Sequence, residues 1–233
     1  MMRLVGRCCV LLIALGLYFT GRLDTQPLTP GGFFRSFTPM HLLWGLWVLD
    51  MFAQLIPVKR DLALGSKKLF VQYFKPTNIR KNAQSLKDYI LTTTRMAYKI
   101  LLLWALLLAV LGGLHRLGIL KDVHLFLISV LFYVCDLICV LIWCPFRLLL
   151  KNRCCTTCRI FNWDHLMMFT PMLFIRSFYS WSLLVMSVAV WCAWETSILL
   201  HPERFWWQSN ENLQCAQCTD KLCTQYCHKL RAG

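Results

Sequence analysis

Long apolar segments alternate with shorter polar segments along most of this 233-residue chain. A helix needs about 20 largely apolar residues to cross a bilayer, and five segments come close to that length. We expect spans at residues 4–20, 40–57, 96–114, 123–146 and about 171–194. The pattern predicts an all-α fold, a polytopic integral membrane helix bundle of about five spans with a short Cys-rich C-terminal tail.

Two Thr-Pro pairs mark expected helix starts, because threonine caps a helix and proline fits its first position. Thr38-Pro39 precedes the second span, and Thr170-Pro171 lies within the 36 apolar residues 165–200. That region is long for one span and short for two. We therefore divide it into an interfacial or re-entrant piece at 161–170 and the fifth span.

The polar segments predict the topology. Residues 58–95 carry nine Lys and Arg against Asp61 and Asp88, and such an excess marks a cytoplasmic loop. We expect a short amphipathic helix around 69–74 in this loop. A second basic segment, the hinge at 147–164, is also expected in the cytoplasm. The N-terminal segment resembles a signal sequence without a cleavage site, which indicates an uncleaved anchor.

Composition agrees with a membrane protein. Hydrophobic residues make up 58% of the chain and charged residues only 15%, and the mean hydropathy is +0.52. The net charge of +14 comes mostly from loops, so it favours contact with membrane lipid and gives no indication of nucleic acid. We expect a multi-pass protein of the inner (cytoplasmic) membrane. Its regions are two N-terminal helices (1–57), the basic loop (58–95), further helices with the hinge (96–200) and the tail (201–233).

The tail carries the clearest chemical pattern. Four of the 13 cysteines, Cys215, Cys218, Cys223 and Cys227, have the spacing C-x2-C-x4-C-x3-C. A C-x2-C pair brings two sulfurs to one metal, as in zinc and iron–sulfur sites. Zinc patterns commonly use two separated pairs, whereas one compact run favours a [4Fe-4S] cluster. A structural Zn2+ bound by the same cysteines stays the alternative.

This spacing resembles a ferredoxin-type motif of iron–sulfur electron-transfer subunits in molybdopterin oxidoreductases and hydrogenases. The likeness covers about 14 residues, and His228 stands where that motif commonly has proline. It implies a cluster held by Cys215, Cys218, Cys223 and Cys227, with His228 as a possible further ligand. The whole chain also resembles uncharacterised bacterial multi-pass membrane proteins, which implies no activity.

Three hinge cysteines are possible additional ligands. In two-cluster ferredoxins, the fourth cysteine of such a run binds the other cluster. On that rule a ligand from Cys154, Cys155 or Cys158 would join the tail cysteines; the alternatives are local ligation by the tail and free or palmitoylated hinge thiols. Five spans would place hinge and tail on opposite faces, so shared ligation requires a different path through 165–200.

Ionisable residues inside spans are costly in lipid and usually face a partner. Asp50 and Asp136 lie inside predicted spans, with Lys99 and Arg176 as available cations. We expect at least one acid–base pair among these four to join two helices; a proton path is the alternative.

No catalytic motif is present in the sequence, which argues against an enzyme. The leading hypothesis is a membrane-anchored iron–sulfur protein, an electron-transfer or redox accessory subunit that works with a larger redox partner protein. Two alternatives are a non-enzymatic membrane scaffold with a structural zinc site and a small transporter that uses Asp50 and Asp136.

Overall fold

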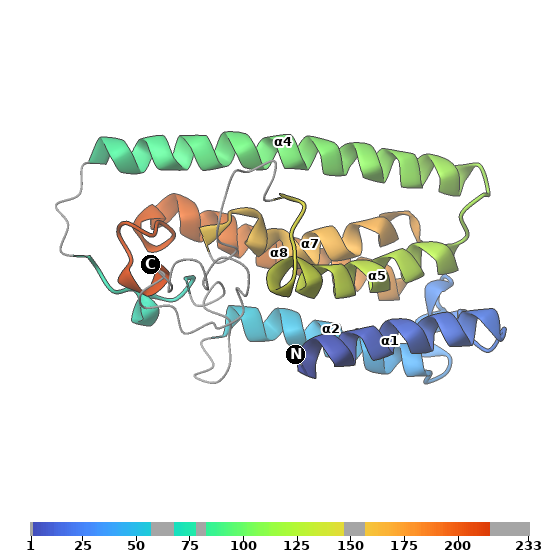
Figure 1. Ribbon diagram of the computed structural model, residues 1–233. Helices are drawn as coiled ribbons and strands as arrows, with labels where there is room; N and C mark the ends of the chain where they lie inside the picture. Colours follow the sequence, from blue (N-terminus) through green and yellow to red (C-terminus); the bar gives the residue numbers. More distant parts are fainter. Residues whose placement is uncertain (1, 57–67, 78–82, 147–156, 215–233) are drawn as a thin grey trace. The chain divides into compact units, whose positions relative to one another are not determined.

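The computed structural model describes residues 2–56, 68–77, 83–146 and 157–214. Within these ranges the chain is all-helical and forms no strand. The α-helices are α1 (Met2–Phe19), α2 (Pro39–Leu55), α4 (Ala83–Arg116), α5 (Asp122–Leu141), α7 (Asp164–Phe169) and α8 (Phe178–Leu200) (Figure 1). Single 3-10 turns are η1 (Gln26–Leu28), η2 (Gly32–Phe34), η3 (Val71–Tyr73), η5 (Ile160–Trp163), η6 (Thr170–Phe174), η7 (Pro202–Arg204) and η8 (Glu211–Leu213).

Three of these helices are long and apolar enough to cross a membrane: α4 over Gln84–Arg116, α5 over Asp122–Val140 and α8. Helix α1 is apolar but shorter, at Leu4–Phe19. These lengths support membrane association. The helical fold class is confirmed, whereas the expected number of five spans stays a prediction.

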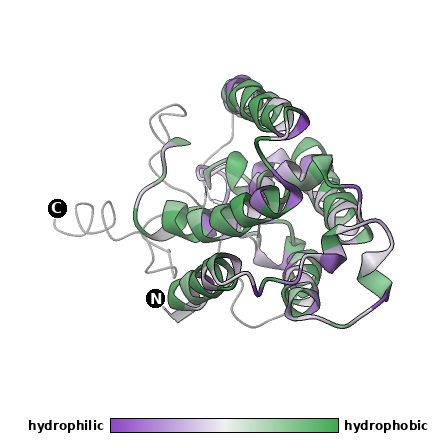
Figure 2. Ribbon diagram, turned by 90° about the vertical axis from the view of Figure 1, so that its right-hand side faces the viewer, coloured by the Kyte–Doolittle hydropathy of each residue, from purple (hydrophilic) through white to green (hydrophobic). Residues whose placement is uncertain are grey.

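Hydrophobic residues predominate in the long helices (Figure 2). Only 17% of the most apolar window of α4 is buried inside the protein. Its exposed side chains include Leu102, Leu106 and Val110, which are spaced four residues apart and therefore share one helix face. Such a face needs an apolar solvent, which lipid provides.

The described chain divides into two compact units, and α2, α4, α5 and α8 contribute residues to both. Unit 1 consists of Met1–Phe52, Leu103–Ile138 and Asp164–Val190, and unit 2 consists of Ala53–Leu102, Cys139–Trp163 and Trp191–Gly233.

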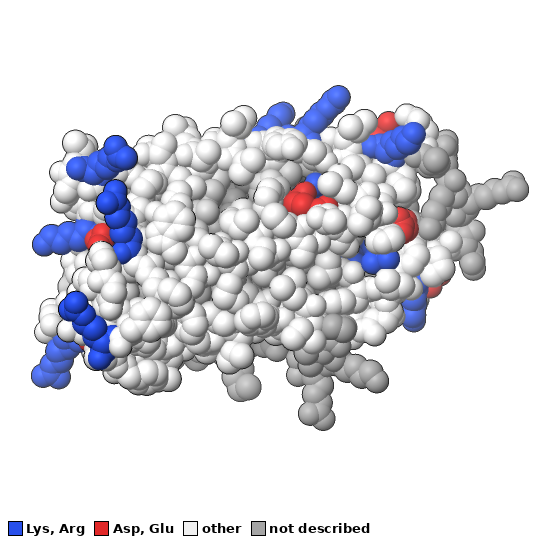
Figure 3. Space-filling model, turned by 180° about the vertical axis from the view of Figure 1, so that it is seen from behind, with Lys and Arg blue, Asp and Glu red and all other residues white. Residues whose placement is uncertain are grey.

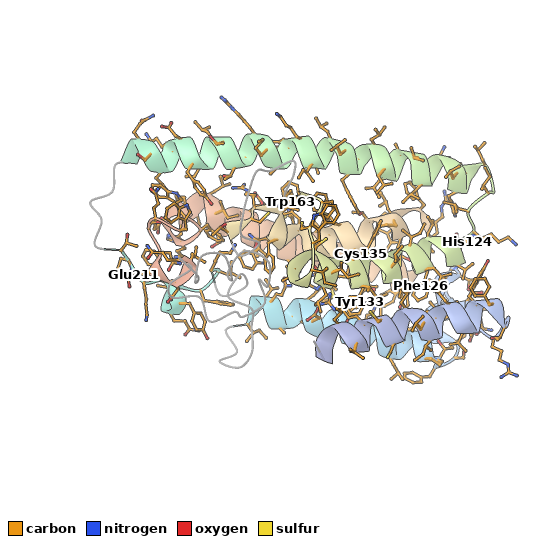
Figure 4. The ribbon with its side chains drawn as sticks, in the orientation of Figure 1. His124, Phe126, Tyr133, Cys135, Trp163 and Glu211 are labelled. Atoms are coloured by element: carbon orange, nitrogen blue, oxygen red, sulfur yellow. The ribbon has the colours of Figure 1, made fainter. Side chains whose placement is uncertain are left out.

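Aromatic side chains form the core of unit 1. Trp47 on α2 is completely buried, with its ring centroid 5.1 Å from that of Phe169 and 5.8 Å from that of Tyr133. Phe126 packs against Tyr179 in the same core. Figure 4 shows Phe126 and Tyr133 along α5. Burying an aromatic ring removes a large apolar area from water, so this cluster ties α2, α5, α7 and α8 together.

In unit 2, the first part of the tail pairs with the described part of the basic loop. Residues 68–77 run beside residues 201–214 (Figure 1), which we call the tail root. Pro76 and Asn210 form an isolated antiparallel bridge, and the Glu211 amide donates to the Lys75 carbonyl at 2.9 Å. The Tyr89 ring stacks on Trp206. The loop and the tail root therefore form one packed element.

Helix boundaries differ from the expected ones at three places. Helix α4 starts at Ala83, so the predicted loop ends 13 residues earlier, because residues 83–95 are polar but contain no helix breaker. Helix α5 ends at Leu141, shortly before Cys144-Pro145, rather than at Phe146. The stretch 69–74 contains only the 3-10 turn η3 rather than an amphipathic α-helix.

The fifth span also starts later than predicted. Pro171 is the second residue of the 3-10 turn η6, and α8 begins at Phe178. The Ser177 hydroxyl accepts a hydrogen bond from the Ser180 amide at 3.2 Å, which caps the helix there. Thr38-Pro39, in contrast, starts α2 as expected.

Candidate functional site

Most of the predicted metal ligands lie outside the described residues. These are Cys215, Cys218, Cys223, Cys227 and His228 in the tail and Cys154 and Cys155 in the hinge. Cys158 is described and is partly buried in unit 2, just before η5. Among the predicted ligands, Cys158 is therefore the one whose surroundings the structure describes.

Cys158 lines a small pocket of unit 2 between hinge, loop and tail root. The lining also includes Lys68 from the loop, Tyr89 from α4, and Pro202 and Phe205 from the tail root. The cavity measures about 20 Å³, enough for about one water molecule. The hinge thiol and the start of the tail thus meet at one place, although they lie more than 40 residues apart in the sequence.

Polar groups around this pocket lack partners among the described residues. Asn162 is 3% exposed, and neither its Nδ2 nor its Oδ1 has a hydrogen-bond partner there; the same holds for Arg159 Nε. Buried polar groups without a partner are uncommon in proteins and call for an explanation. Both residues line the pocket beside Cys158, which has room for about one water molecule, so a water bound there could pair with them.

Positive charge also gathers at this pocket. Lys68 is only 3% exposed, and its Nζ lies 5.7 Å from the ring centroids of both Phe161 and Phe205. The Arg159 guanidinium forms a salt bridge with Glu195 of α8. The Trp163 indole N–H donates to the other Glu195 oxygen at 2.8 Å. Glu195 thereby fixes the hinge to the C-terminal half of α8.

A second thiol, which the sequence analysis assigned to a span, lies near Cys158. Burial raises the pKa of the Cys158 thiol, and the nearby Cys144 acts in the same direction, whereas two backbone amides and Lys68 oppose the shift. Cys144 is buried and precedes Pro145, which cannot continue a helix. That Cys-Pro pair was the one sequence signal that α5 would end there.

The described residues do not complete a metal site. Among them, no group of three or more His, Cys, Asp and Glu side chains is placed to hold a metal ion. Cys158 and Cys144 are two thiols with the softness that zinc and iron–sulfur centres select. A four-thiolate centre at this place would need its other ligands from outside the described ranges.

Unit 1 contains a separate cluster of charges centred on Arg7 of α1. Its Nη1 donates to Asp136 Oδ2 of α5 at 2.7 Å and to the Tyr133 carbonyl at 2.8 Å. Its Nη2 lies 3.7 Å from Asp50 Oδ2 of α2. The guanidinium also lies 4.1 Å above the Tyr133 ring, on the side of α5 that faces α1 (Figure 4). Arg7 therefore joins three helices.

His165 of α7 extends this cluster. Its Nε2 lies 3.3 Å from Asp50 Oδ2, and its Nδ1 lies 3.1 Å from Asp164 Oδ1. Both ring nitrogens face carboxylate oxygens, and only the imidazolium form has two N–H donors. Within the described ranges, the cluster brings Asp50, Asp136 and Asp164 together with Arg7 and His165.

The two predicted acids are paired, but not with the predicted cations. Lys99 and Arg176 are both exposed, and neither has an ion pair among the described residues. Arg7 takes that place because α1 packs against α5, which no pattern in the sequence showed. Arg7 lies in the N-terminal segment that was expected to be an uncleaved anchor.

No family model, curated protein or solved structure matches this chain. Its function must therefore be argued from its own residues.

Proposed function

We propose that this chain is a membrane-anchored iron–sulfur protein, an electron-transfer or redox accessory subunit that serves a larger redox partner. One observation carries the proposal: the hinge thiol Cys158 and the tail root line the same pocket of unit 2. The cysteine run begins at Cys215, ten residues after Phe205. The tail root ends at Gln214, so the cysteine run starts at the end of the element that lines this pocket with Cys158.

The same contacts support a common membrane face for hinge and tail. Lys68 touches Phe161 of the hinge and Phe205 of the tail root, and Arg204 donates to the Leu69 carbonyl at 3.3 Å. Segments in contact lie on one side of a bilayer. The chain between them, through α7, η6 and α8, must then leave that face and return to it. The basic loop would make this face the cytoplasmic one.

The electrostatics of the pocket suit a thiolate cluster. Four thiolates give such a centre net negative charge, and nearby cations and N–H donors set its stability and reduction potential. Lys68, Arg159 and the unpaired Asn162 amide supply these groups beside Cys158. When bound, the cluster would accept and release one electron at a time. The chain would hold it at the membrane surface, where a partner can approach.

Metal analysis of the full-length protein tests this proposal. Protein purified in detergent under anaerobic conditions should contain iron and acid-labile sulfide, and should show visible absorbance that dithionite bleaches. A colourless protein with stoichiometric zinc would contradict the iron–sulfur assignment and favour the scaffold with a structural zinc site.

A pair of cysteine variants tests the role of the pocket. Cys158→Ser should lower the iron content or change the electron paramagnetic resonance spectrum of the reduced protein. Cys192→Ser is the matched control, because Cys192 is an exposed cysteine of α8 that does not line the pocket. Equal iron content and identical spectra in both variants would show that the tail binds the cluster without the hinge.

A second candidate function, a small transporter that uses Asp50 and Asp136, is favoured by the ionisable cluster of unit 1. Asp50 and Asp136 gather there with Arg7 and His165, and ionisable residues inside a membrane protein commonly mark an ion or proton pathway. Proteoliposomes should then take up protons or a monovalent cation in response to an imposed gradient. Uptake that persists in Asp136→Asn would rule out this role.

A further inference from the structure

A larger pocket opens among the connecting segments of unit 1, and none of its residues belongs to the proposed metal centre. It is formed by Leu28 and Pro30 before α2, the last residues of α4, the first residue of α5, the segment before α8 and Trp181 in the first turn of α8. Its volume is about 550 Å³, which lies in the range of about 300–1,000 Å³ typical of ligand sites.

Two arginines line this pocket, and neither has an ion-pair or hydrogen-bond partner among the described residues. Arg116 ends α4, and Arg176 lies two residues before α8. Both are exposed. The third basic group, His115, is already paired, because its Nε2 lies 2.8 Å from Asp122 Oδ1. The pocket therefore presents two unpaired guanidinium groups, which bind phosphate oxygens through paired N–H donors.

The rest of the lining is apolar. Leu173 is 42% exposed and Trp181 is 49% exposed, although both lie beside the arginines. A large apolar surface next to cations at a helix end is typical of a membrane interface, where tryptophan lies at the level of the headgroups. A free inorganic phosphate would leave this apolar surface uncovered, whereas a phosphate attached to an acyl chain would cover it.

The surroundings strengthen the attraction for anions. The exposed basic residues in the connecting segments of unit 1 are Arg22, Arg35, Arg116, Lys121 and Arg176, against the acidic Asp24 and Asp122. Figure 3 shows such basic side chains gathered at the left-hand edge of the face that it presents. Basic residues near a membrane surface attract anionic lipid.

We propose that this pocket binds the phosphate headgroup of an anionic phospholipid, with Arg116 and Arg176 on the phosphate and Trp181 and Leu173 against the acyl chain. The site is independent of the metal centre, so either proposal can fail without the other.

Native mass spectrometry of the full-length protein tests the site. The protein is released from nanodiscs of phosphatidylcholine, or of phosphatidylcholine with phosphatidylglycerol, and the bound lipids are counted. Phosphatidylglycerol should be retained preferentially. Arg116→Gln and Arg176→Gln should each weaken this retention about tenfold, because each removes charge-assisted hydrogen bonds to the phosphate in addition to the general surface attraction. Arg35→Gln is the control, because Arg35 is an exposed arginine of the same unit that does not line the pocket.

Two further experiments distinguish a bound lipid from a bound soluble anion. Trp181→Ala should reduce phosphatidylglycerol retention while the protein keeps its thermal stability in phosphatidylcholine. Inorganic phosphate at millimolar concentration should compete poorly. Equal losses in Arg35→Gln and Arg116→Gln would overturn the site, and full competition by inorganic phosphate would overturn the lipid.

Discussion

At the scale of single residues, Arg7 contacts several partners whose contribution a substitution can test. One guanidinium reaches two carboxylates, a backbone carbonyl and an aromatic ring. Its side chain is 15% exposed and that of Asp136 is 22% exposed, so the pair is largely removed from water. Loss of one partner of such a pair costs more than the pair itself contributes, since the remaining charge stays buried.

We expect Arg7→Met to destabilise the protein by about 3 kcal/mol, measured by unfolding in mixed detergent micelles. Arg7→Lys keeps the charge but loses the planar fork that reaches both acids, so its cost should be smaller. The double variant Arg7→Met with Asp136→Asn should recover part of the loss, because it removes both charges. Wild-type stability in Arg7→Met would mean that the cluster adds nothing to folding.

At the scale of elements, close approach between α4 and η6 depends on one glycine. A Cβ atom added at Gly112 would lie 2.5 Å from the Phe174 ring, whereas one added at Gly113 would meet no heavy atom within 4 Å. The two neighbouring glycines therefore differ only in which side of α4 they occupy. Phe174 also lines the proposed lipid pocket.

Gly112→Ala should destabilise the protein by about 1 kcal/mol, because the ring must move to avoid the new methyl group. Gly113→Ala should be neutral or stabilising, because alanine favours a helix over glycine by about 0.5–1 kcal/mol. Thermal unfolding of both variants in one detergent gives the comparison. If both substitutions changed the stability in the same direction, packing against Phe174 would not determine the effect of Gly112→Ala.

Local sequence signals predicted some elements well and others poorly. Thr38-Pro39 fixes the start of α2 because cap and proline act within one turn. The start of α8 at Phe178 was missed, since Ser177 is a weaker signal than Thr170-Pro171. The polar first part of α4 was missed because the spans were predicted from apolar residues and not from helix propensity.

Contacts between residues far apart in the sequence could not be predicted from any sequence pattern. Arg7 and Asp136 are 129 residues apart, and no spacing rule links them. The presence of a paired acid could be predicted from the cost of charge in lipid, but the identity of its partner depends on which helices pack together. The proximity of Cys158 to the tail root has the same origin.

At the scale of the whole molecule, the contacts in unit 2 make a prediction about membrane topology. Fusions of alkaline phosphatase or green fluorescent protein after Thr157 and after Gln208 should report the same side of the membrane. A fusion after Leu117 should report the opposite side, because α4 is long enough to cross. Opposite reports from Thr157 and Gln208 would separate hinge and tail and contradict shared ligation.

The shortness of α1 has a consequence for the lipid around it. Its 18 residues give a length of about 27 Å, against a hydrocarbon thickness of about 30 Å. If α1 crosses the membrane, as its sequence predicts, this hydrophobic mismatch is relieved when the bilayer thins around the helix. Thinning would shorten the path of water to Arg7, which lies about one and a half turns from the start of α1. A thicker bilayer should therefore affect α1 before the longer helices, and with it the ion pairs of Arg7.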